Sequence, residues 1–265
     1  ELDGTLHVEN LRLAAQTDRY LLAGDDVTKL HPHFTFHGFQ YVEVTGLETK
    51  PSLDFLEGVA VSSNPPVVGS FNCSNPMLNK LWDNILWTQR DNTVSIPTDC
   101  PQRNERMGWM GDAEVFAQNA IYNMDMAAFF SKFSVDMRDG QGEEGQYPDF
   151  APHPFPEHLV FTFGPGWADC GVIIPWRLYC AYNDKRILAE NYPAMKKYVD
   201  LIIDENPDFI WRHWGSNYGD WLHGDTLQAK GYPKKGGECP KDVYATLFYY
   251  LSSLLLSKSA DVLGV

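Results

Sequence analysis

The sequence predicts a mainly α-helical domain preceded by a shorter β-rich segment. Three observations support this class. Residues 1–65 alternate β-branched or aromatic segments with Gly and Pro, residues 66–265 carry apolar side chains at helical spacing, and the pattern changes at Asn64-Pro65-Pro66. We therefore expect two units: residues 1–65 as the C-terminal part of a β-sandwich domain, and residues 66–265 as a helical domain.

In the first unit, strands are expected at residues 17–22, 34–36, 40–44 and 59–62, because these short segments are rich in β-branched or aromatic residues. The residues that punctuate them are Gly24, Pro32, Gly38, Gly46 and Pro51. The set is too short and too widely spaced for a complete sandwich.

The helical unit begins at Asn75-Pro76, since Asn is a preferred N-cap and Pro fits the first helical position. Apolar residues then recur on one face at Leu78, Leu81, Trp82, Ile85 and Leu86. Further helices are expected at about residues 112–123, 126–139, 168–183, 185–204 and 241–259, with Asp125 and Asp184 as N-caps. Two long connections, residues 140–166 and 205–240, are rich in aromatic residues, which favours functional loops over disorder.

The formal net charge of −14 and the lack of a Lys/Arg cluster argue against a nucleic acid partner. No apolar run is long enough for a membrane span, so no membrane partner is expected. The sequence starts with Glu1 instead of Met, from which we expect that it begins inside a longer protein. No compartment is assigned.

No metal or other cofactor is expected. The five cysteines (Cys73, Cys100, Cys170, Cys180 and Cys239) include no C-x-x-C pair. Cys170 and Cys180 are expected to be small buried residues of a helix. The closely spaced His31, His33 and His37 are expected to be structural or exposed.

The segment DCPQRNERMGWMGD, residues 99–112, holds three carboxylates, two arginines and a tryptophan between two expected helices. Glycoside hydrolysis needs an acid to protonate the leaving oxygen and a second carboxylate to activate water or attack carbon. Glu105 is the candidate acid, because burial near Trp109 and between Asp99 and Asp112 would favour a protonated carboxyl group, whereas Arg103 and Arg106 would oppose it. The structural alternative is an Arg–carboxylate network that only fixes the loop.

The positions of the eight tryptophans distinguish those in expected helices from those at loops or helix ends. Trp82, Trp87 and Trp176 lie in expected helices and are assigned mostly to the core. Trp109, Trp167 and Trp221 lie near carboxylates at loops or helix ends, where a sugar ring would find apolar contact and hydrogen bonds together. Plain packing is the alternative for each of them.

The string DCPQRNERMGWMGDAEVFAQNA, residues 99–120, resembles the signature of the α-L-rhamnosidases of glycoside hydrolase family 78. Other segments resemble the same family in the same order: FTFHGFQYVEV at 34–44, residues 122–141 ending in DMRDGQ, YPDFAP at 147–152, GWAD at 166–169 and YGDW at 218–221.

The resemblance implies part of an (α/α)6 barrel of twelve helices, preceded by a β-sandwich remnant, and an inverting hydrolase that removes terminal α-L-rhamnose. It implies Glu105 as general acid and a rhamnose subsite lined by Asp99, Arg103, Trp109 and Asp112. Trp167 and Trp221 fall near aromatic positions of the family. Asn104 stands where the family usually has Asp, which removes one carboxylate beside the acid.

The family's general base is a Glu from a later loop, and no segment before Val265 matches that loop. We expect the base beyond the chain end, not at Glu143, Glu144, Glu157 or Glu238. This stretch alone is expected to be inactive, and half a toroid with exposed apolar helix faces is expected to aggregate or to form a homo-oligomer.

Two alternatives stay open. One keeps the barrel and changes the chemistry to another inverting glycosidase or a sugar phosphorylase. The other is a carbohydrate-binding fragment without catalysis. Activity on a rhamnoside compared with glucosides, with and without phosphate, separates them.

Overall fold

The computed structural model of this chain describes residues 4–22, 24, 29–154, 161–213, 215–221 and 237–265. In this part of the chain, six α-helices make up nearly all the regular structure. They are α1 (Pro76–Asp91), α2 (Met110–Asn123), α3 (Ala127–Asp139), α4 (Cys170–Tyr182), α5 (Lys185–Glu205) and α6 (Lys241–Leu263). All six helices expected from the sequence are therefore confirmed, and α6 runs further than its expected end.

The polar residues that precede three helices explain where those helices start. Asn75 Oδ1 accepts from the Met77 N–H at 2.9 Å and Asp184 Oδ1 accepts from the Arg186 N–H at 3.0 Å, so each satisfies a backbone donor that has no partner in its helix. Asp125 Oδ1 accepts from the Ala127 N–H at 3.2 Å, one residue before the N-cap position of α3.

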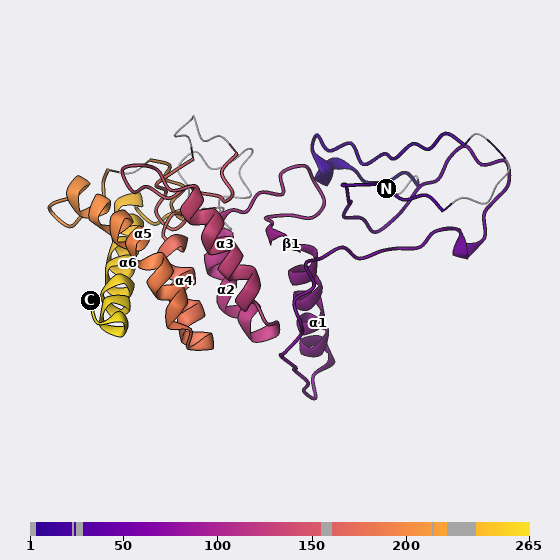
Figure 1. Ribbon diagram of the computed structural model, residues 1–265. Coiled ribbons are helices and arrows are strands. Elements are labelled where there is room, and N and C mark those ends of the chain that lie inside the picture. Colours follow the sequence, from indigo (N-terminus) through magenta and orange to yellow (C-terminus); the bar gives the residue numbers. More distant parts are fainter. Residues whose placement is uncertain (1–3, 23, 25–28, 155–160, 214, 222–236) are drawn as a thin grey trace.

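Helices α2 to α6 form one packed group, in which α4 lies at the centre against α2, α3, α5 and α6 (Figure 1). The first six residues of α4, Cys170 to Pro175, are all buried, as expected of a helix covered on every side. The packed core takes large side chains from this group of helices, among them Met110, Phe130, Phe133, Ile174, Met195 and Tyr198.

Helix α1 stands apart from this group (Figure 1). Its C-terminal end is tied to α2, where the buried Gln89 donates to Ala120 O and accepts from Asn123 Nδ2, both at 3.1 Å. Leu86 is buried, whereas Leu78 and Leu81 at the other end are exposed. The expected apolar face therefore forms, but only its C-terminal part is covered by the rest of the described chain.

Two details of the expected core are wrong. Trp87 is exposed, and its ring lies under the Arg90 guanidinium at 5.0 Å from the ring centroid. Cys180 is exposed near the end of α4, although Cys170 at its start is buried. In both cases helical spacing alone did not show which part of the helix the neighbouring helices cover.

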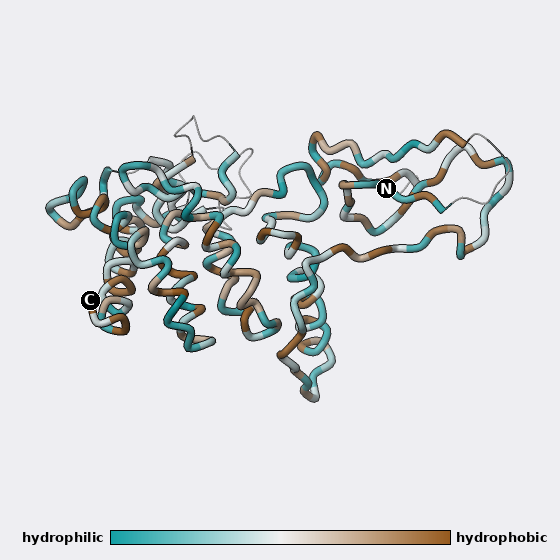
Figure 2. Tube along the Cα trace, viewed as in Figure 1, coloured by the Kyte–Doolittle hydropathy of each residue, from teal (hydrophilic) through white to brown (hydrophobic). Residues whose placement is uncertain are grey.

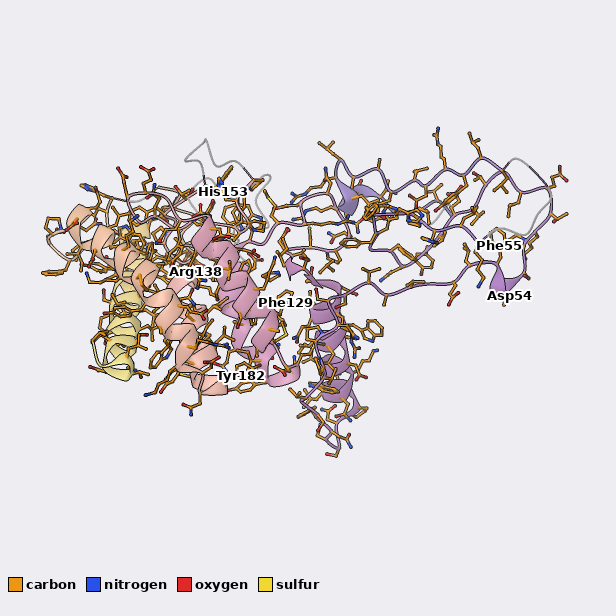
Figure 3. All side chains as sticks on the ribbon, viewed as in Figure 1. Asp54, Phe55, Phe129, Arg138, His153 and Tyr182 are labelled. Atoms are coloured by element: carbon orange, nitrogen blue, oxygen red, sulfur yellow. The ribbon has the colours of Figure 1, made fainter. Side chains whose placement is uncertain are left out.

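The strands expected in the first unit are also wrong for the described residues between 4 and 65, which hold only two 3-10 turns, Glu9–Leu11 and Leu53–Phe55. The chain there is extended and projects away from the helices (Figures 1 and 2). Figure 3 places Asp54 and Phe55 at its outer edge. An extended segment becomes a strand only when a neighbour supplies a hydrogen-bonded ladder, and no such ladder forms here.

The one sheet in the described chain is a small antiparallel pair, β1 (Thr93–Val94) and β2 (Ile96–Pro97), directly after α1. Ser95 makes the turn between them with a φ of 65°. This pair directs the chain from α1 into the loop at residues 98–109, which carries the candidate site. No helix among the described residues combines the length and hydrophobicity of a membrane span.

Candidate active site

The loop between β2 and α2 closes on itself. The Asp99 N–H donates to Met107 O at 3.0 Å, and the Met107 N–H donates to Asp99 Oδ1 at 2.9 Å. Just after this closure, the Ala151 N–H donates to Gly108 O at 2.9 Å, and a Cβ on Gly108 would lie 2.2 Å from Ala151 O. Gly108 is therefore needed for the close approach of two backbones, and the loop has a fixed place above α2.

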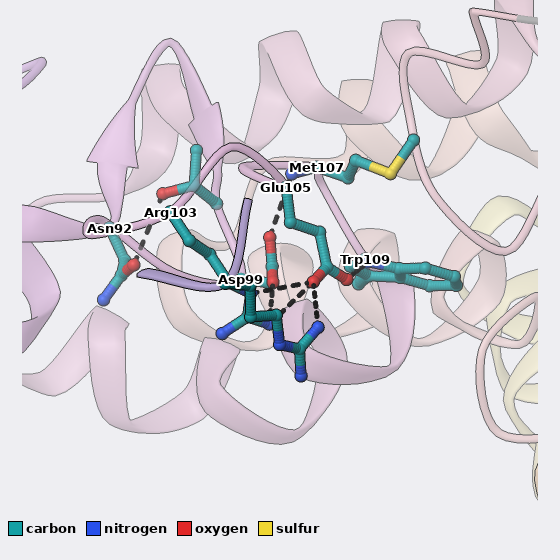
Figure 4. Close-up of polar contacts among 8 residues, drawn as sticks. Asn92, Asp99, Arg103, Glu105, Met107 and Trp109 are labelled. Carbon is teal, nitrogen blue, oxygen red and sulfur yellow. Dashed lines mark hydrogen bonds and ion pairs between the residues drawn. The ribbon is translucent and has the colours of Figure 1, made fainter. Parts of the chain in front are cut away.

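Arg103 joins the two carboxylates of this closed loop (Figure 4). Its Nη2 donates to Asp99 Oδ2 at 3.2 Å and to Glu105 Oε2 at 2.6 Å, and its Nε donates to the same Glu105 oxygen at 3.0 Å. Trp109 Nε1 donates to Glu105 Oε1 at 3.0 Å. Both Glu105 oxygens therefore have partners, and the Arg–carboxylate network that the structural alternative predicted is present.

The other residues of this loop take different roles. Arg106 donates to the carbonyl oxygens of Phe36 and Pro101, and its guanidinium lies 4.1 Å from the centroid of the Phe36 ring. It thus ties the loop to the extended N-terminal segment. Asn104 is exposed and makes no hydrogen bond within the described chain, so the substitution of the family's usual Asp lies outside the Arg103 network.

The carboxylates of the site differ in how far their surroundings raise their pKa values. Burial raises the pKa of Asp99, and the Glu105 charge adds to this, against hydrogen bonds from Cys100 and Met107 and the Arg103 charge. The pKa of Asp112, at the start of α2, rises to about 6, first through loss of solvation and then through the Asp99 charge. Asp112 itself is exposed, so it meets solvent while it interacts with the negative charge of Asp99.

An aromatic wall connects the expected tryptophans. The Trp109 ring lies edge-on to Phe150 at 4.9 Å and to Tyr218 at 6.0 Å between centroids. Tyr218 lies 4.4 Å from Trp167 and 5.7 Å from Trp221. Such a wall offers the apolar surface that the C–H face of a sugar requires.

Tyr218 is itself held in place by a buried carboxylate. Its hydroxyl donates to Asp149 Oδ2 at 2.8 Å, while the Gly164 N–H donates to Asp149 Oδ1 at 2.9 Å. Sequence reasoning missed Tyr218, Asp149 and Phe150 as site residues. The segments YPDFAP and YGDW contain these residues, and their aromatic and acidic positions are the signal that could have identified them.

Three of the predicted residues, Asp112, Trp167 and Trp221, line a cavity of about 260 Å³ beside the loop. The other side chains that line this cavity belong to Val115, Asp220 and Tyr244, together with Gly111, Gly166 and Gly219. Asp99, Arg103, Glu105 and Trp109 form the adjoining cluster and are not part of this lining. The seven predicted residues thus form two groups. The Tyr218 ring connects them, because it contacts Trp109 of one group and Trp167 of the other.

A cation site in the loop is conceivable on composition, because ligand atoms of Asp99, Cys100 and Glu105 lie within 4.8 Å of one another. However, the Arg103 guanidinium already supplies positive charge to both carboxylates there. Within the described residues, His31, His33 and His37 join no such group; His37 Nε2 instead lies 3.1 Å from Asp18 Oδ2.

Of the carboxylates set aside as general base, Glu143, Glu144 and Glu238 are exposed and form no hydrogen bond or ion pair with the described residues of the cluster. Glu157 lies outside the described residues.

Three carboxyl groups near the site predict how stability depends on pH. Burial raises the pKa of Asp169 to about 6 and the pKa of Glu114 well above its usual range, where the Asp169 charge adds to the effect. Asp112 also titrates near 6. The folded state therefore binds more protons than the unfolded state once the pH exceeds about 4, so stability is highest below that value and is lost as the pH rises through 6.

We expect the free energy of unfolding to fall between pH 4.5 and 7, by about 1.4 kcal/mol per pH unit for each proton by which the states differ. Urea unfolding followed by circular dichroism at several pH values measures this slope. Glu114→Gln should flatten it, because an amide does not titrate. A stability that rises over this range, or an unchanged slope in the variant, would contradict the assignment.

The comparisons with known proteins agree with this geometry. A model of the family described as the bacterial alpha-L-rhamnosidase 6 hairpin glycosidase domain matches residues 66–265, and one for the bacterial alpha-L-rhamnosidase concanavalin-like domain matches residues 1–62. The expected class, a mainly α-helical part of a six-hairpin barrel, is confirmed by the first match and by the structural similarity that follows.

Among curated proteins, an alpha-L-rhamnosidase of Streptomyces avermitilis is 42% identical over 99% of this chain and 24% of its own length. One of Formosa agariphila is 39% identical over 99% of this chain and 28% of its own length. Among solved structures, that of the Streptomyces avermitilis alpha-L-rhamnosidase complexed with L-rhamnose matches all of this chain and 24% of that chain, with 40% identity and a TM-score of 0.89. The chain spans about a quarter of the length of the curated relatives it matches.

Proposed function

The chain belongs to the bacterial α-L-rhamnosidase family, and on that premise we propose that it carries the acid-bearing part of the active site of a glycoside hydrolase that removes terminal α-L-rhamnose. The observation that carries the proposal is the closed loop at residues 99–107, which holds Glu105 between Arg103 and Trp109 beside an aromatic wall. A sugar ring can lie against such a wall while a carboxyl group reaches its glycosidic oxygen.

In this proposal Glu105 is the general acid. Both of its oxygens accept hydrogen bonds, so donation of a proton requires that one of these contacts is exchanged for the glycosidic oxygen. The Glu105 side chain keeps 28% of its surface exposed, which leaves a direction from which that oxygen can approach. The general base is proposed to come from the part of the relatives' length that this chain does not span.

The remaining predicted residues bind the sugar. Asp99, Arg103 and Asp112 offer charge-assisted hydrogen bonds to hydroxyl groups, and Trp109, Trp167 and Trp221 offer apolar contact. We further propose that the two units, residues 1–65 and 66–265, meet at Asn64-Pro65-Pro66, next to the gap that the two family matches leave at residues 63–65.

The test is hydrolysis by the protein encoded by the complete reading frame that contains residues 1–265. We expect release of 4-nitrophenol from the α-L-rhamnoside and none above background from the corresponding glucosides. Turnover that depends on phosphate would favour the phosphorylase alternative. Binding of rhamnose without any turnover would favour the non-catalytic alternative.

The reaction is proposed to invert the anomeric centre. In inverting enzymes the two carboxyl groups stand roughly 6.5–9.5 Å apart, which leaves room for the attacking water. Proton NMR during hydrolysis of an α-L-rhamnoside should therefore show β-rhamnose first, before mutarotation produces the α anomer. If α-rhamnose forms first, the reaction retains configuration and the assignment is wrong.

The 265-residue chain by itself is expected to associate and to lack activity. Exposed apolar side chains lie on α1 at Met77, Leu78 and Leu81, and on α6 at Leu247 and Tyr250. Exposed apolar patches favour aggregation or pairing with a second copy. Size-exclusion chromatography with light scattering should report more than a monomer, and Leu81→Lys with Leu247→Lys should reduce the association. A monodisperse, fully active monomer would contradict both expectations.

A further inference from the structure

The turn at Gly166–Asp169 carries Trp167 into the cavity beside Asp112, directly before α4 begins. Asp169 at its end is completely buried. Its Oδ2 accepts from the Gly166 N–H at 2.8 Å, and its Oδ1 accepts from Ser252 Oγ at 2.5 Å. One carboxylate thus connects the turn before α4 to the middle of α6.

The Trp167 indole is confined by two neighbours. A Cβ on Gly111 would lie 2.7–2.8 Å from ring atoms of Trp167, so the indole rests directly on the α2 backbone next to Asp112. The Tyr218 ring covers it at 4.4 Å between centroids.

The turn is confined as well. Gly166 has a φ of +77°, and a Cβ there would lie 2.2 Å from the Tyr244 hydroxyl. Because this turn carries Trp167, a small movement of the turn would change how far the indole reaches into the cavity.

We propose that Asp169, held by Ser252 of α6, is a positioning residue that sets the place of Trp167 and so the shape of the cavity beside Asp112. Burying a carboxylate is costly unless it is hydrogen-bonded, and each Asp169 oxygen has such a bond. Of the residues that line the cavity, Asp169 hydrogen-bonds Gly166, which directly precedes Trp167, so its effect on a ligand is expected to pass mainly through this turn. That the ligand is a sugar rests on the proposed function; the positioning itself does not.

A general structural link between α4 and α6 is the competing explanation, and a matched pair of variants distinguishes the two. Ser252→Ala removes the hydroxyl that donates to Asp169. Ser259→Ala removes an equally buried hydroxyl of the same helix, which donates only to Leu255 O. The experiment uses the complete protein labelled with 5-fluorotryptophan, with the Trp167 ¹⁹F resonance assigned from its absence in Trp167→Phe.

We expect Ser252→Ala to shift or broaden the Trp167 resonance clearly more than that of Trp211, whose backbone N–H donates to Thr246 of the same helix and which therefore reports a general change in α6. KM for the rhamnoside should rise on the order of ten-fold, with a smaller change in kcat, since a misplaced wall weakens binding in ground and transition states alike. Ser259→Ala should change neither, and Ser252→Thr, which keeps the donor, should restore both.

Gly111→Ala gives a second approach if Ser252→Ala does not fold, because Ala favours a helix while its methyl group must displace the indole. The same resonance should move and KM should rise. An unmoved Trp167 resonance in the folded variants, or equal changes at Trp211, would overturn the proposal. A moved resonance in a protein without rhamnosidase activity would support the positioning role and refute the proposed function alone.

Discussion

Glu105→Gln is expected to lower kcat for a rhamnoside with a poor leaving group by about 10²–10⁴-fold, the usual contribution of general acid catalysis. The variant keeps the size of the side chain, and its amide oxygen can still accept from Trp109 Nε1. It cannot supply a proton to the departing oxygen.

Leaving-group dependence makes this expectation specific. A substrate with a very good leaving group needs little protonation, so its turnover should fall much less than that of an alkyl rhamnoside. Glu144→Gln is the matched control, because Glu144 is exposed and forms no hydrogen bond or ion pair with the described residues of the cluster. Near-normal hydrolysis of the alkyl rhamnoside by Glu105→Gln would remove Glu105 from the role of acid.

The helices could be predicted from the sequence because their determinants are local. Asn75-Pro76 and Asp184 mark the starts of α1 and α5 through contacts that span only a few residues. The strands expected in the first unit do not form in its described residues, since a strand depends on a hydrogen-bonded partner elsewhere in the chain and the composition of residues 40–44 does not show whether that partner is present. The exposure of Trp87 has the same origin: helical spacing identifies a face, but packing decides which part of it is covered.

The candidate site was predictable to the extent that one short loop contains it. Residues 99–112 bring Asp99, Arg103, Glu105 and Trp109 together by local geometry. The cavity beside Asp112 instead draws on segments far apart in the chain. Tyr244 and Ser252 lie in α6, more than 130 residues after Asp112, and no local pattern in α6 connects them with Trp167.

Arg103 is the residue whose removal should disturb the loop most. Its guanidinium makes all the hydrogen bonds that join Asp99 to Glu105, and its side chain is only 20% exposed. Without it, two carboxylates whose oxygens lie within 4.8 Å would face each other, with only the weaker contact of Arg12 Nη1 to Glu105 Oε2, at 3.7 Å, to supply positive charge. Because hydrogen bonds to charged groups are among the stronger ones in proteins, the relative position of the two carboxylates depends mainly on this side chain.

Arg103→Met, which keeps most of the apolar stem, is therefore expected to lower kcat/KM for an α-L-rhamnoside on the order of 10²–10³-fold. Arg103→Lys should recover only part of this loss, because one ammonium group cannot reproduce the planar contacts to both carboxylates. Arg106→Met is the control: it removes a guanidinium from the same loop, but one that donates to Phe36 O and Pro101 O instead of to a carboxylate. Steady-state kinetics of the three variants, with thermal unfolding to confirm that each is folded, measures the difference. Equal losses in Arg103→Met and Arg106→Met would mean that the loop needs any two arginines for its shape, and the specific pairing of Arg103 with Glu105 would then have no part in catalysis.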